Sequence, residues 1–318
     1  MKGSRRGFVA TSVGGGLAMA AGTVEAKTET TPRVDRRPFG KTGAEVSIYG
    51  LGLGSAFFKP FAGKPDEAAR MLERAVELGI NYWDTAHSYG NSEELIGPVL
   101  EKHRSEIFMV SKSRAATYDE FMKEVEGSLK NLRTDYLDLY HMHNWQPTRG
   151  DATPQAREGA FKAVTQLKEQ GVIRNFGVTG HSGAEILIQC VKAFNPDALL
   201  TTFPANRPDG GKYEDELLPL CVERNMGVIA MKTVKHVKNS DQQPRELIRY
   251  ALSLPGVSTA IVGTGDIDHL ESNAKLATAF KPFEKNELKA FSDKVAVNIP
   301  TGLPQPWDLP GYEDGMLA

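Results

Sequence analysis

Cysteine is scarce in this sequence: Cys190 and Cys221 are the only two, and they do not form a Cys-x-x-Cys pair. Neither a disulfide framework nor a metal cluster held by cysteines is therefore indicated. An excess of charge of one sign is also lacking, since the formal net charge is −2, so we expect no general attraction to nucleic acid or to an anionic membrane. Hydrophobic residues at 40% and charged residues at 25% are typical of a globular protein with a sizeable core.

No apolar run is long enough to cross a membrane, so no stable membrane anchor is expected. The best candidate, Val9 to Gly22, is short and consists mostly of Ala, Gly, Val and Ser. It follows Arg5 and Arg6 in a stretch that resembles a twin-arginine export signal, and Ala26 ends a segment suited to a signal peptidase. We therefore predict a twin-arginine signal peptide at residues 1–26, recognised by the twin-arginine translocation machinery, and a periplasmic or exported protein. A disordered arm on a cytoplasmic protein is the alternative.

After a polar linker at residues 27–33, the remaining residues, 34–318, are near the size of a (β/α)8 barrel with additions. The turn residues from Gly40 to Gly43 predict a hairpin over Arg37–Ile48. Apolar runs then alternate with segments of helical period, and several of these helices end at a glycine. This alternation predicts an α/β TIM barrel of eight strand–helix units, with an N-terminal β-hairpin and an extra C-terminal helix.

The predicted strands are Val46–Leu53, Tyr82–Asp84, Ile107–Ser111, Tyr136–Met142, Ile173–Val178, Leu199–Phe203, Val228–Met231 and Thr259–Val262. The predicted helices are Asp66–Leu78, Glu93–Lys102, Tyr118–Leu132, Pro154–Gln170, Ala184–Phe194, Tyr213–Arg224, Pro244–Leu254 and Ile267–Lys275, with the extra helix at Lys285–Val297. An open doubly wound sheet is the competing architecture, because Gly50–Gly54 looks like a dinucleotide-binding loop. We expect no helix to begin in Ser55–Pro60, so these glycines indicate close backbone approach at a strand end instead.

Four side chains able to carry out chemistry stand where predicted strands give way to loops: Asp84, Tyr89, Lys112 and His143. Strand ends are where a (β/α)8 barrel keeps its active site. When a hydride reaches a carbonyl carbon, negative charge develops on the oxygen, and a positioned acid must neutralise it. We predict Tyr89 as this general acid/base and Lys112 as the ammonium that lowers the pKa of the phenol. Asp84 would anchor Lys112, and His143 would orient the substrate oxygen.

The histidines near this set leave a second hypothesis open. His141 and His143 are two residues apart, so their side chains face the same side of a strand, with His143 nearer the C-terminal mouth. Together with Asp84, His87 and His181, this pair could bind a metal ion, as in a metal-dependent hydrolase or isomerase on the same barrel. Lys112 would place a cation beside such a metal, and for this reason we predict no metal site.

The sequence resembles the aldo/keto reductase superfamily from Arg37 to about Leu276. The matches are Phe39-Gly40-Lys41-Thr42-Gly43, Gly50 to Gly54, Asp84-Thr85-Ala86 with Tyr89-Gly90, Lys112, Asp135 to Tyr140 leading to His143, Gly171 to Arg174, and Phe176 to Val178. The resemblance implies a (β/α)8 barrel that binds a nicotinamide cofactor and uses a Tyr/Lys/Asp/His tetrad. It implies an NAD(P)(H)-dependent oxidoreductase that reduces an aldehyde or ketone, or oxidises the alcohol. A cofactor-binding barrel with little turnover is a further alternative.

The cofactor positions that the resemblance implies match the family pattern less well. Thr179 and Gly180 stand where the family usually has Ser-Asn to hold the carboxamide. Thr202 aligns with a usual Gln, Met231 with the aromatic that stacks on nicotinamide, and Lys232 is placed to reach the pyrophosphate. The other predicted cofactor-binding residues are Gly54, Ser55, Asp84, Gly263, Thr264, His269, Ser272 and Asn273. Because this last region lacks the family's Lys, Arg and Glu, NAD(H) is an open alternative to the expected NADP(H).

The substrate is expected to be a small carbonyl or alcohol compound enclosed by the loops that follow the strands. Phe57, His87, Trp145 and Trp307 are the predicted walls of its pocket. Aromatic walls suit an apolar or a sugar-like molecule.

Overall fold

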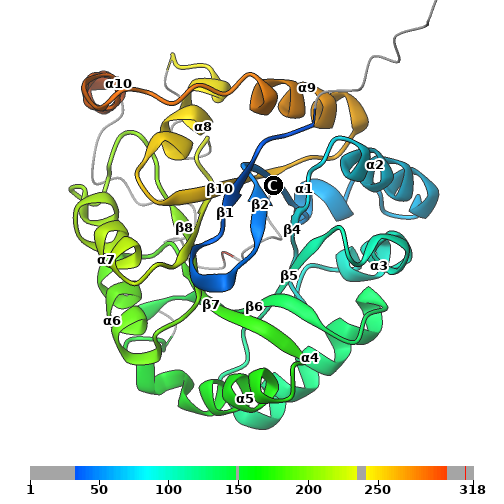
Figure 1. Ribbon diagram of the computed structural model, residues 1–318. Coiled ribbons are helices and arrows are strands. Elements are labelled where there is room, and N and C mark those ends of the chain that lie inside the picture. Colours follow the sequence, from blue (N-terminus) through cyan, green and yellow to red (C-terminus); the bar gives the residue numbers. More distant parts are fainter. Residues whose placement is uncertain (1–32, 148–149, 235–240, 299–311, 313–318) are drawn as a thin grey trace, which may run out of the picture. The chain divides into compact units, whose positions relative to one another are not determined.

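The computed structural model describes residues 33–147, 150–234, 241–298 and 312. They form a closed barrel of parallel strands in the order β10-β3-β4-β5-β6-β7-β8-β9. Figure 1 shows these strands in the middle and the helices around them. The predicted (β/α)8 barrel is therefore confirmed. The predicted signal peptide and all of the linker except Arg33 lie outside the described residues, and the export signal stays a prediction.

The barrel strands are short and almost entirely buried, as expected where helices cover one face and the barrel interior the other. They are β3 Tyr49–Gly52, β4 Tyr82–Asp84, β5 Phe108–Ser113, β6 Leu137–Trp145, β7 Ile173–Gly180, β8 Ala198–Thr202, β9 Gly227–Met231 and β10 Val257–Gly263. The helices are α1 Ser55–Phe58, α2 Pro65–Glu77, α3 Ser92–His103, α4 Tyr118–Leu132, α5 Glu158–Glu169, α6 Ala184–Phe194, α7 Leu218–Glu223, α8 Pro244–Ser253, α9 Ile267–Thr278 and α10 Lys285–Asn298. Within the described ranges, none of these helices has the length and apolar character needed to span a membrane.

The first predicted strand, Val46–Leu53, is wrong as a single element. Its beginning is β2, Glu45–Ser47, which pairs antiparallel with β1, Arg36–Pro38, and completes the predicted hairpin. The chain then enters the barrel as β3, which pairs in parallel with β4 and β10. The two halves belong to different sheets, and a run of apolar residues does not reveal such a change of partner.

The expectation that no helix begins after Gly54 is also wrong, because α1 starts at Ser55. It is a single turn, and the barrel is closed, so the open doubly wound alternative does not hold. Two predicted helices begin with other geometry: η3, Pro154–Arg157, is a 3-10 turn before α5, and η4, Tyr213–Leu217, is a π-helix before α7. The π-helix precedes Pro219, whose missing N–H removes one regular helical hydrogen bond.

The N-terminal hairpin closes one end of the barrel. Phe39 lies at its tip, before the 3-10 turn η1, Gly40–Thr42, and is fully buried. Its ring packs edge-on against Tyr82 and Phe108, with centroid distances of 5.6 and 5.2 Å. Gly227 leaves room for this ring, since a Cβ there would lie 2.5 Å from Phe39 Cε2. The opposite end, where the strands terminate, is therefore the end that is left for a site.

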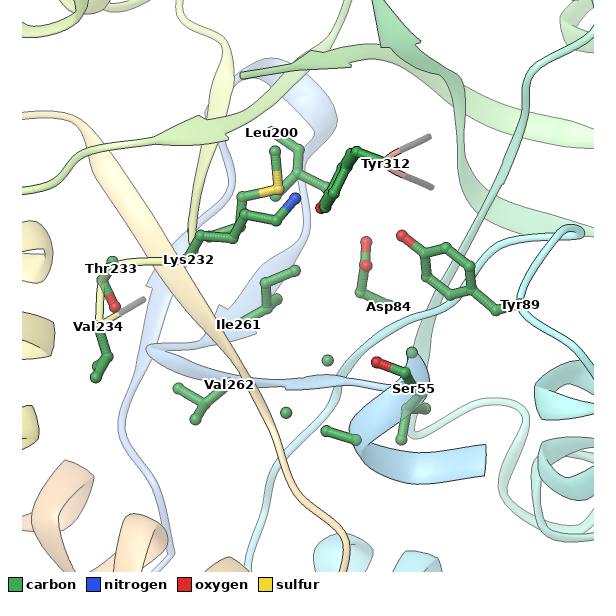
Figure 2. A pocket seen from close by; sticks show the side chains of 16 residues that line it. Ser55, Asp84, Tyr89, Leu200, Lys232, Thr233, Val234, Ile261, Val262 and Tyr312 are labelled. Carbon is green, nitrogen blue, oxygen red and sulfur yellow. The ribbon is translucent and has the colours of Figure 1, made fainter. Parts of the chain in front are cut away.

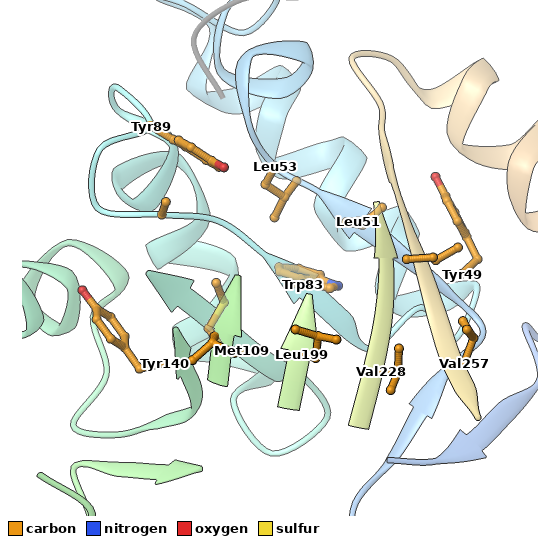
Figure 3. Packing of buried hydrophobic residues seen from close by; sticks show 14 of the residues in the cluster. Tyr49, Leu51, Leu53, Trp83, Tyr89, Met109, Tyr140, Leu199, Val228 and Val257 are labelled. Atoms are coloured by element: carbon orange, nitrogen blue, oxygen red, sulfur yellow. The ribbon is translucent and has the colours of Figure 1, made fainter. Parts of the chain in front are cut away.

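A second apolar layer lies between the barrel and its helices. Figure 3 shows it with Trp83, Met109, Tyr140, Leu199 and Val228, which come from β4, β5, β6, β8 and β9 in turn. Their neighbours in sequence point to the barrel interior because side chains alternate along a strand. The strands therefore carry polar groups inward at their C-terminal ends without breaking the outer apolar layer.

Replacement of Phe39 by alanine is expected to lower the free energy of unfolding by about 3–5 kcal/mol, because it leaves a cavity at the closed end of the barrel. Denaturation with urea measures this change. Val297→Ala is the control, since that side chain is 85% exposed and its loss is expected to change stability by less than about 0.5 kcal/mol. Equal stability of Phe39→Ala and the wild type would contradict the role given to the hairpin.

Candidate active site

The predicted tetrad converges at the C-terminal end of three neighbouring strands. Asp84 is the last residue of β4, Lys112 lies in β5, His143 lies in β6, and Tyr89 lies in the loop between β4 and α3. The Lys112 Nζ atom donates to Asp84 Oδ1 at 2.7 Å and to the carbonyl of Thr85 at 2.6 Å. The Tyr89 hydroxyl lies 3.4 Å from His143 Nε2.

The Lys112–Asp84 ion pair is desolvated, with both side chains no more than 3% exposed. A buried pair of this kind holds a fixed geometry, because removing either partner leaves an uncompensated charge. The ammonium also lies 4.8 Å from the centroid of the Tyr89 ring. A fixed positive charge therefore stands beside the phenol, as its proposed chemistry requires.

His141 lies deeper in the barrel than His143. It pairs in register with Lys112 on one side and Gly177 on the other. Burial, and then the charge of Lys112, hold the pKa of His141 well below its usual range, so this imidazole is neutral. No three His, Cys, Asp or Glu side chains among the described residues gather as metal ligands would. The metal-dependent alternative is therefore not favoured.

A cavity of about 310 Å³ opens in front of Asp84 and Tyr89. Figure 2 shows Asp84, Tyr89, Lys232 and Tyr312 converging on it. Of the predicted cofactor-binding residues, those that line it are Gly54, Ser55, Asp84, Met231, Lys232 and Gly263. Lining residues that the sequence did not indicate are Leu200, Thr233, Val234, Ile261, Val262 and Tyr312.

One wall of this cavity is made of backbone. A Cβ on Gly263 would lie 2.7 Å from the Ala56 side chain, and one on Gly265 would lie 2.6 Å from the Ala56 carbonyl. Glycine is thus required where the loop after β10 passes α1. A Cβ on Gly52 would lie 3.2 Å from the backbone of Gly263, so the end of β3 also packs closely on the end of β10.

Tyr312 is the lining residue that is most remote in sequence. Its ring packs edge-on against His181, with a centroid distance of 5.6 Å, and the Lys232 ammonium lies 5.6 Å from the ring centroid. Lys232 has a left-handed backbone, with φ of +55°, directly after β9. A non-glycine residue in this conformation marks a constrained position, which fits its place at the cavity.

The remaining predicted cofactor residues do not line this cavity. Thr179 is engaged through Oγ1, which accepts from the Asn144 N–H at 3.2 Å, and Gly180 fits tightly against the Trp145 carbonyl. Thr202 is buried at the end of β8, beside Met231. The members near α9 are Thr264, which bonds the Tyr49 hydroxyl at 2.9 Å, Asn273, which donates to that hydroxyl at 3.4 Å, and the exposed His269 and Ser272.

Asn273 lines a second cavity, of about 340 Å³, between α8 and α9. Val262 lines both cavities, so the two are adjacent across the end of β10. The second cavity carries three cationic side chains against one carboxylate: Arg245, Arg249 and Lys281 against Glu246. The sequence did not indicate this groove, because its charges lie on α8 and on the segment after α9, which are separated along the chain.

Of the four predicted substrate walls, Phe57, His87 and Trp145 do not line the cavity in front of Tyr89. Phe57 is fully buried in the core, where its ring packs on Phe61 at a centroid distance of 5.3 Å. Trp145 is also fully buried and packs against Phe194 on the outer side of the barrel. His87 pairs with Glu93 of α3, with its Nδ1 atom 3.4 Å from Glu93 Oε2. Trp307 lies outside the described residues.

Comparisons with known proteins agree with this geometry. A sequence profile described as "Aldo/keto reductase family" matches residues 50–246. The chain is 26% identical over 317 residues to the uncharacterized oxidoreductase YqkF of Bacillus subtilis, which covers 83% of this chain and 97% of that protein. It is 26% identical over 291 residues to L-galactose dehydrogenase of Arabidopsis thaliana, covering 77% and 89%. It is 30% identical over 190 residues to methylglyoxal reductase YeaE of Escherichia coli, covering 58% and 64%.

Solved structures show the same fold. A putative aldo-keto reductase from Pseudomonas aeruginosa superposes with a TM-score of 0.67 at 28% identity and covers 80% of this chain and 98% of that one. An aldo/keto reductase from Klebsiella pneumoniae, solved in complex with NADP and acetate, superposes with a TM-score of 0.67 at 24% identity and covers 85% and 96%. At this identity, the second likeness concerns the fold alone.

Lys112→Met is expected to lower the free energy of unfolding by about 3–5 kcal/mol, because it leaves the Asp84 carboxylate buried without its cation. Adding Asp84→Asn is expected to restore part of the loss, since it removes the orphaned charge. Lys162→Met is the matched control, because Lys162 pairs with Glu158 at 3.3 Å while both side chains are more than 60% exposed, and its loss is expected to cost less than about 1 kcal/mol. Urea denaturation of the four proteins measures these changes, and similar losses for both lysines would be inconsistent with a buried, coupled pair.

Proposed function

Because the chain belongs to the aldo/keto reductase family, we propose that it transfers a hydride between a nicotinamide nucleotide and an aldehyde or ketone, with Tyr89 as general acid. This proposal rests on the position of the Tyr89 hydroxyl. It stands at the cavity between His143, at 3.4 Å, and the buried Lys112–Asp84 pair, whose ammonium lies 4.8 Å from the ring centroid. A phenol so flanked can give up a proton at a developing alkoxide and take it back in the reverse direction.

Each tetrad residue has a distinct part in this chemistry. Tyr89 donates its proton to the carbonyl oxygen of the substrate. Lys112 stabilises the phenolate that results, and Asp84 keeps the ammonium in place. His143 orients the Tyr89 hydroxyl through the contact with its Nε2 atom. Which of the two groups donates the hydrogen bond depends on the tautomer of the imidazole. When bound, the nicotinamide ring supplies or accepts the hydride.

The residues around the cavity fit a dinucleotide. Met231 offers an apolar platform beside Asp84 and Tyr89, and Lys232 places a cation at the same cavity. Glycine backbone on the opposite wall allows close approach. The second cavity shares Val262 with the first and includes Asn273 and Arg245, which supports an extended ligand that occupies both.

The cations of that second cavity support NADP(H) over NAD(H) in our proposal, because a 2′-phosphate binds most strongly where guanidinium groups outnumber carboxylates. Arg245→Ala is expected to weaken the binding of NADPH about tenfold and to leave that of NADH unchanged. Fluorescence titration with both nucleotides measures this, with Arg70→Ala on the exposed side of α2 as the control. Equal losses for both nucleotides would contradict a phosphate contact.

The substrate class that we propose is a small polar carbonyl compound or the corresponding alcohol. Two relatives bear names of this kind, L-galactose dehydrogenase and methylglyoxal reductase, and they describe opposite directions of the same carbonyl chemistry. Methylglyoxal and simple aldoses are therefore the first substrates to test.

Tyr89→Phe is expected to lower kcat for carbonyl reduction by about 10²–10⁴-fold while nucleotide binding is unchanged, because the ring remains and only the acid is lost. Consumption of NADPH measures the activity. Tyr118→Phe is the matched control, since the Tyr118 hydroxyl bonds Gln166 between α4 and α5, away from the cavity. Full activity of Tyr89→Phe would rule out Tyr89 as the acid. Tight nucleotide binding without turnover in the wild type would favour a cofactor-binding barrel.

A further inference from the structure

Behind the tetrad, on the outer side of β5, lies a buried carboxylate that the proposed reaction does not use. Glu93, in the first turn of α3, is 2% exposed. Its Oε1 atom accepts from the Ser111 hydroxyl at 2.6 Å, and Oε2 accepts from the Asn131 side chain at 3.2 Å. The Nδ1 atom of His87 lies 3.4 Å from Oε2. Glu93 therefore joins three elements at one point.

The partners of Glu93 are the sequence neighbours of tetrad residues. Ser111 directly precedes Lys112 in β5, and His87 lies two residues before Tyr89. The backbone N–H of His87 also donates to the Lys112 carbonyl at 3.0 Å. The N–H of Tyr89 donates to the Ala86 carbonyl at 2.9 Å, which closes a turn around His87. The backbone of His87 is thus bonded directly to Lys112 and lies inside the turn that leads to Tyr89.

The same network reaches the strand of His143. The Ser128 hydroxyl of α4 lies 3.4 Å from His87 Nδ1 and 3.2 Å from the Tyr140 hydroxyl of β6. Tyr140 and Met142 face the outer layer, while His141 and His143 alternate with them and face inward. The network therefore touches, from outside the barrel, the elements that carry Tyr89, Lys112 and His143.

Helix α4 is adapted to the His87 ring. Gly127 lies in the interior of this helix, where glycine is a poor helix former. A Cβ at this position would lie 2.8 Å from His87 Cε1, closer than such contacts occur. The absence of a side chain at residue 127 is therefore what allows His87 to lie against α4 and reach Glu93.

We propose that His87 and Glu93 form a positioning pair that holds the Tyr89 loop and β5 in the arrangement needed for proton transfer. Neither residue lines the cavity in front of Tyr89, and the pair acts through Tyr89 and Lys112. This inference rests on the proposed function, because the proton transfer that the pair assists belongs to the proposed reaction. It replaces the predicted place of His87 in the wall of the substrate pocket.

The charges around His87 give the pair a dependence on pH. Its hydrogen bond with Glu93 raises the pKa of His87, burial works against this rise, and the charges of Glu93 and Glu124 add to it. Burial alone would raise the pKa of Glu93, but its bonds with His87, Ser111 and Ser128 lower it, so the carboxylate is ionised. Among the described groups packed around His87, β5 contributes the Lys112 carbonyl, α4 contributes Ser128 and Glu124, and β6 contributes Tyr140 through Ser128.

The direction of the pH dependence follows from the raised pKa of His87. Because the folded pKa of His87 is raised, the charged pair is fully present below the ordinary pKa of a histidine and is lost as pH rises through the folded value. We expect kcat to fall about threefold as pH rises through that value. The affinity for the nucleotide is expected to stay constant, because the cavity wall is not touched.

His87→Ala is expected to lower kcat about tenfold and to abolish this pH step, with nucleotide Kd unchanged, since small misplacements of a catalytic group cost about this much or more. His87→Gln keeps an uncharged donor toward Glu93 and is expected to recover part of kcat without the pH step. His103→Gln is the matched control, because His103 lies on the same helix as Glu93 and pairs with Glu73 and Glu106 at 2.7 and 2.8 Å on its partly exposed side. It is expected to leave kcat and its pH profile unchanged. NADPH and methylglyoxal are the probes.

Gly127→Ala provides a second test that leaves His87 and Glu93 in place. The added methyl group is expected to displace the ring and lower kcat in the wild-type background, but to have no effect on kcat in His87→Ala. Because alanine favours a helix, the gain in melting temperature is expected to be larger in His87→Ala than in the wild type. Additive effects of the two substitutions would overturn the proposal.

The failure of this inference can be distinguished from failure of the proposed function. If the wild type reduces no carbonyl, the proposed reaction fails, and the ring resonances of labelled Tyr89 still test the positioning. These resonances are expected to shift in His87→Ala and Gly127→Ala and to stay unchanged in His103→Gln. If the wild type turns over and His87→Ala keeps its kcat, its pH profile and its Tyr89 resonances, the positioning pair is refuted.

Discussion

The buried ion pair between Lys112 and Asp84 is the interaction on which the rest of the site depends. Two charges taken out of water at 2.7 Å can persist only where their geometry is fixed on every side. Here β4 and β5 supply that geometry: Asp84 pairs in register with Val110, and Lys112 follows two residues later on the same side of β5. The ammonium then serves Tyr89 without needing to move, which is what makes a preorganised site effective.

The fold was largely predictable because its signals are local. Apolar strands, helical periodicity and glycine at helix ends each follow from nearby residues. The errors arose where strands that are distant in the sequence determine how a segment pairs. Val46–Leu53 divides because its halves pair with different sheets, β1 on one side and β4 and β10 on the other. β6 extends to Trp145 because β7 continues beside it as far as Gly180.

The site was predictable where strand ends determine it, and Asp84, Lys112 and His143 lie together for this reason. It was not predictable where the direction of a side chain or the packing of Tyr312 determines which residues meet. His87 lies two residues from Tyr89, yet it points to the back of the barrel, and the one local hint was a glycine inside helix α4, at Gly127. Tyr312 reaches the cavity from a segment whose sequence carries no periodic signal.

We propose that this cavity holds a nicotinamide nucleotide against the tetrad. The most direct test is a titration of the full-length protein with NADPH, followed by quenching of its tryptophan fluorescence and by release of any bound nucleotide after denaturation. We expect saturable binding in the micromolar range or tighter, or nucleotide already bound at one molecule per chain. Absence of both, in protein shown to be folded, would contradict it.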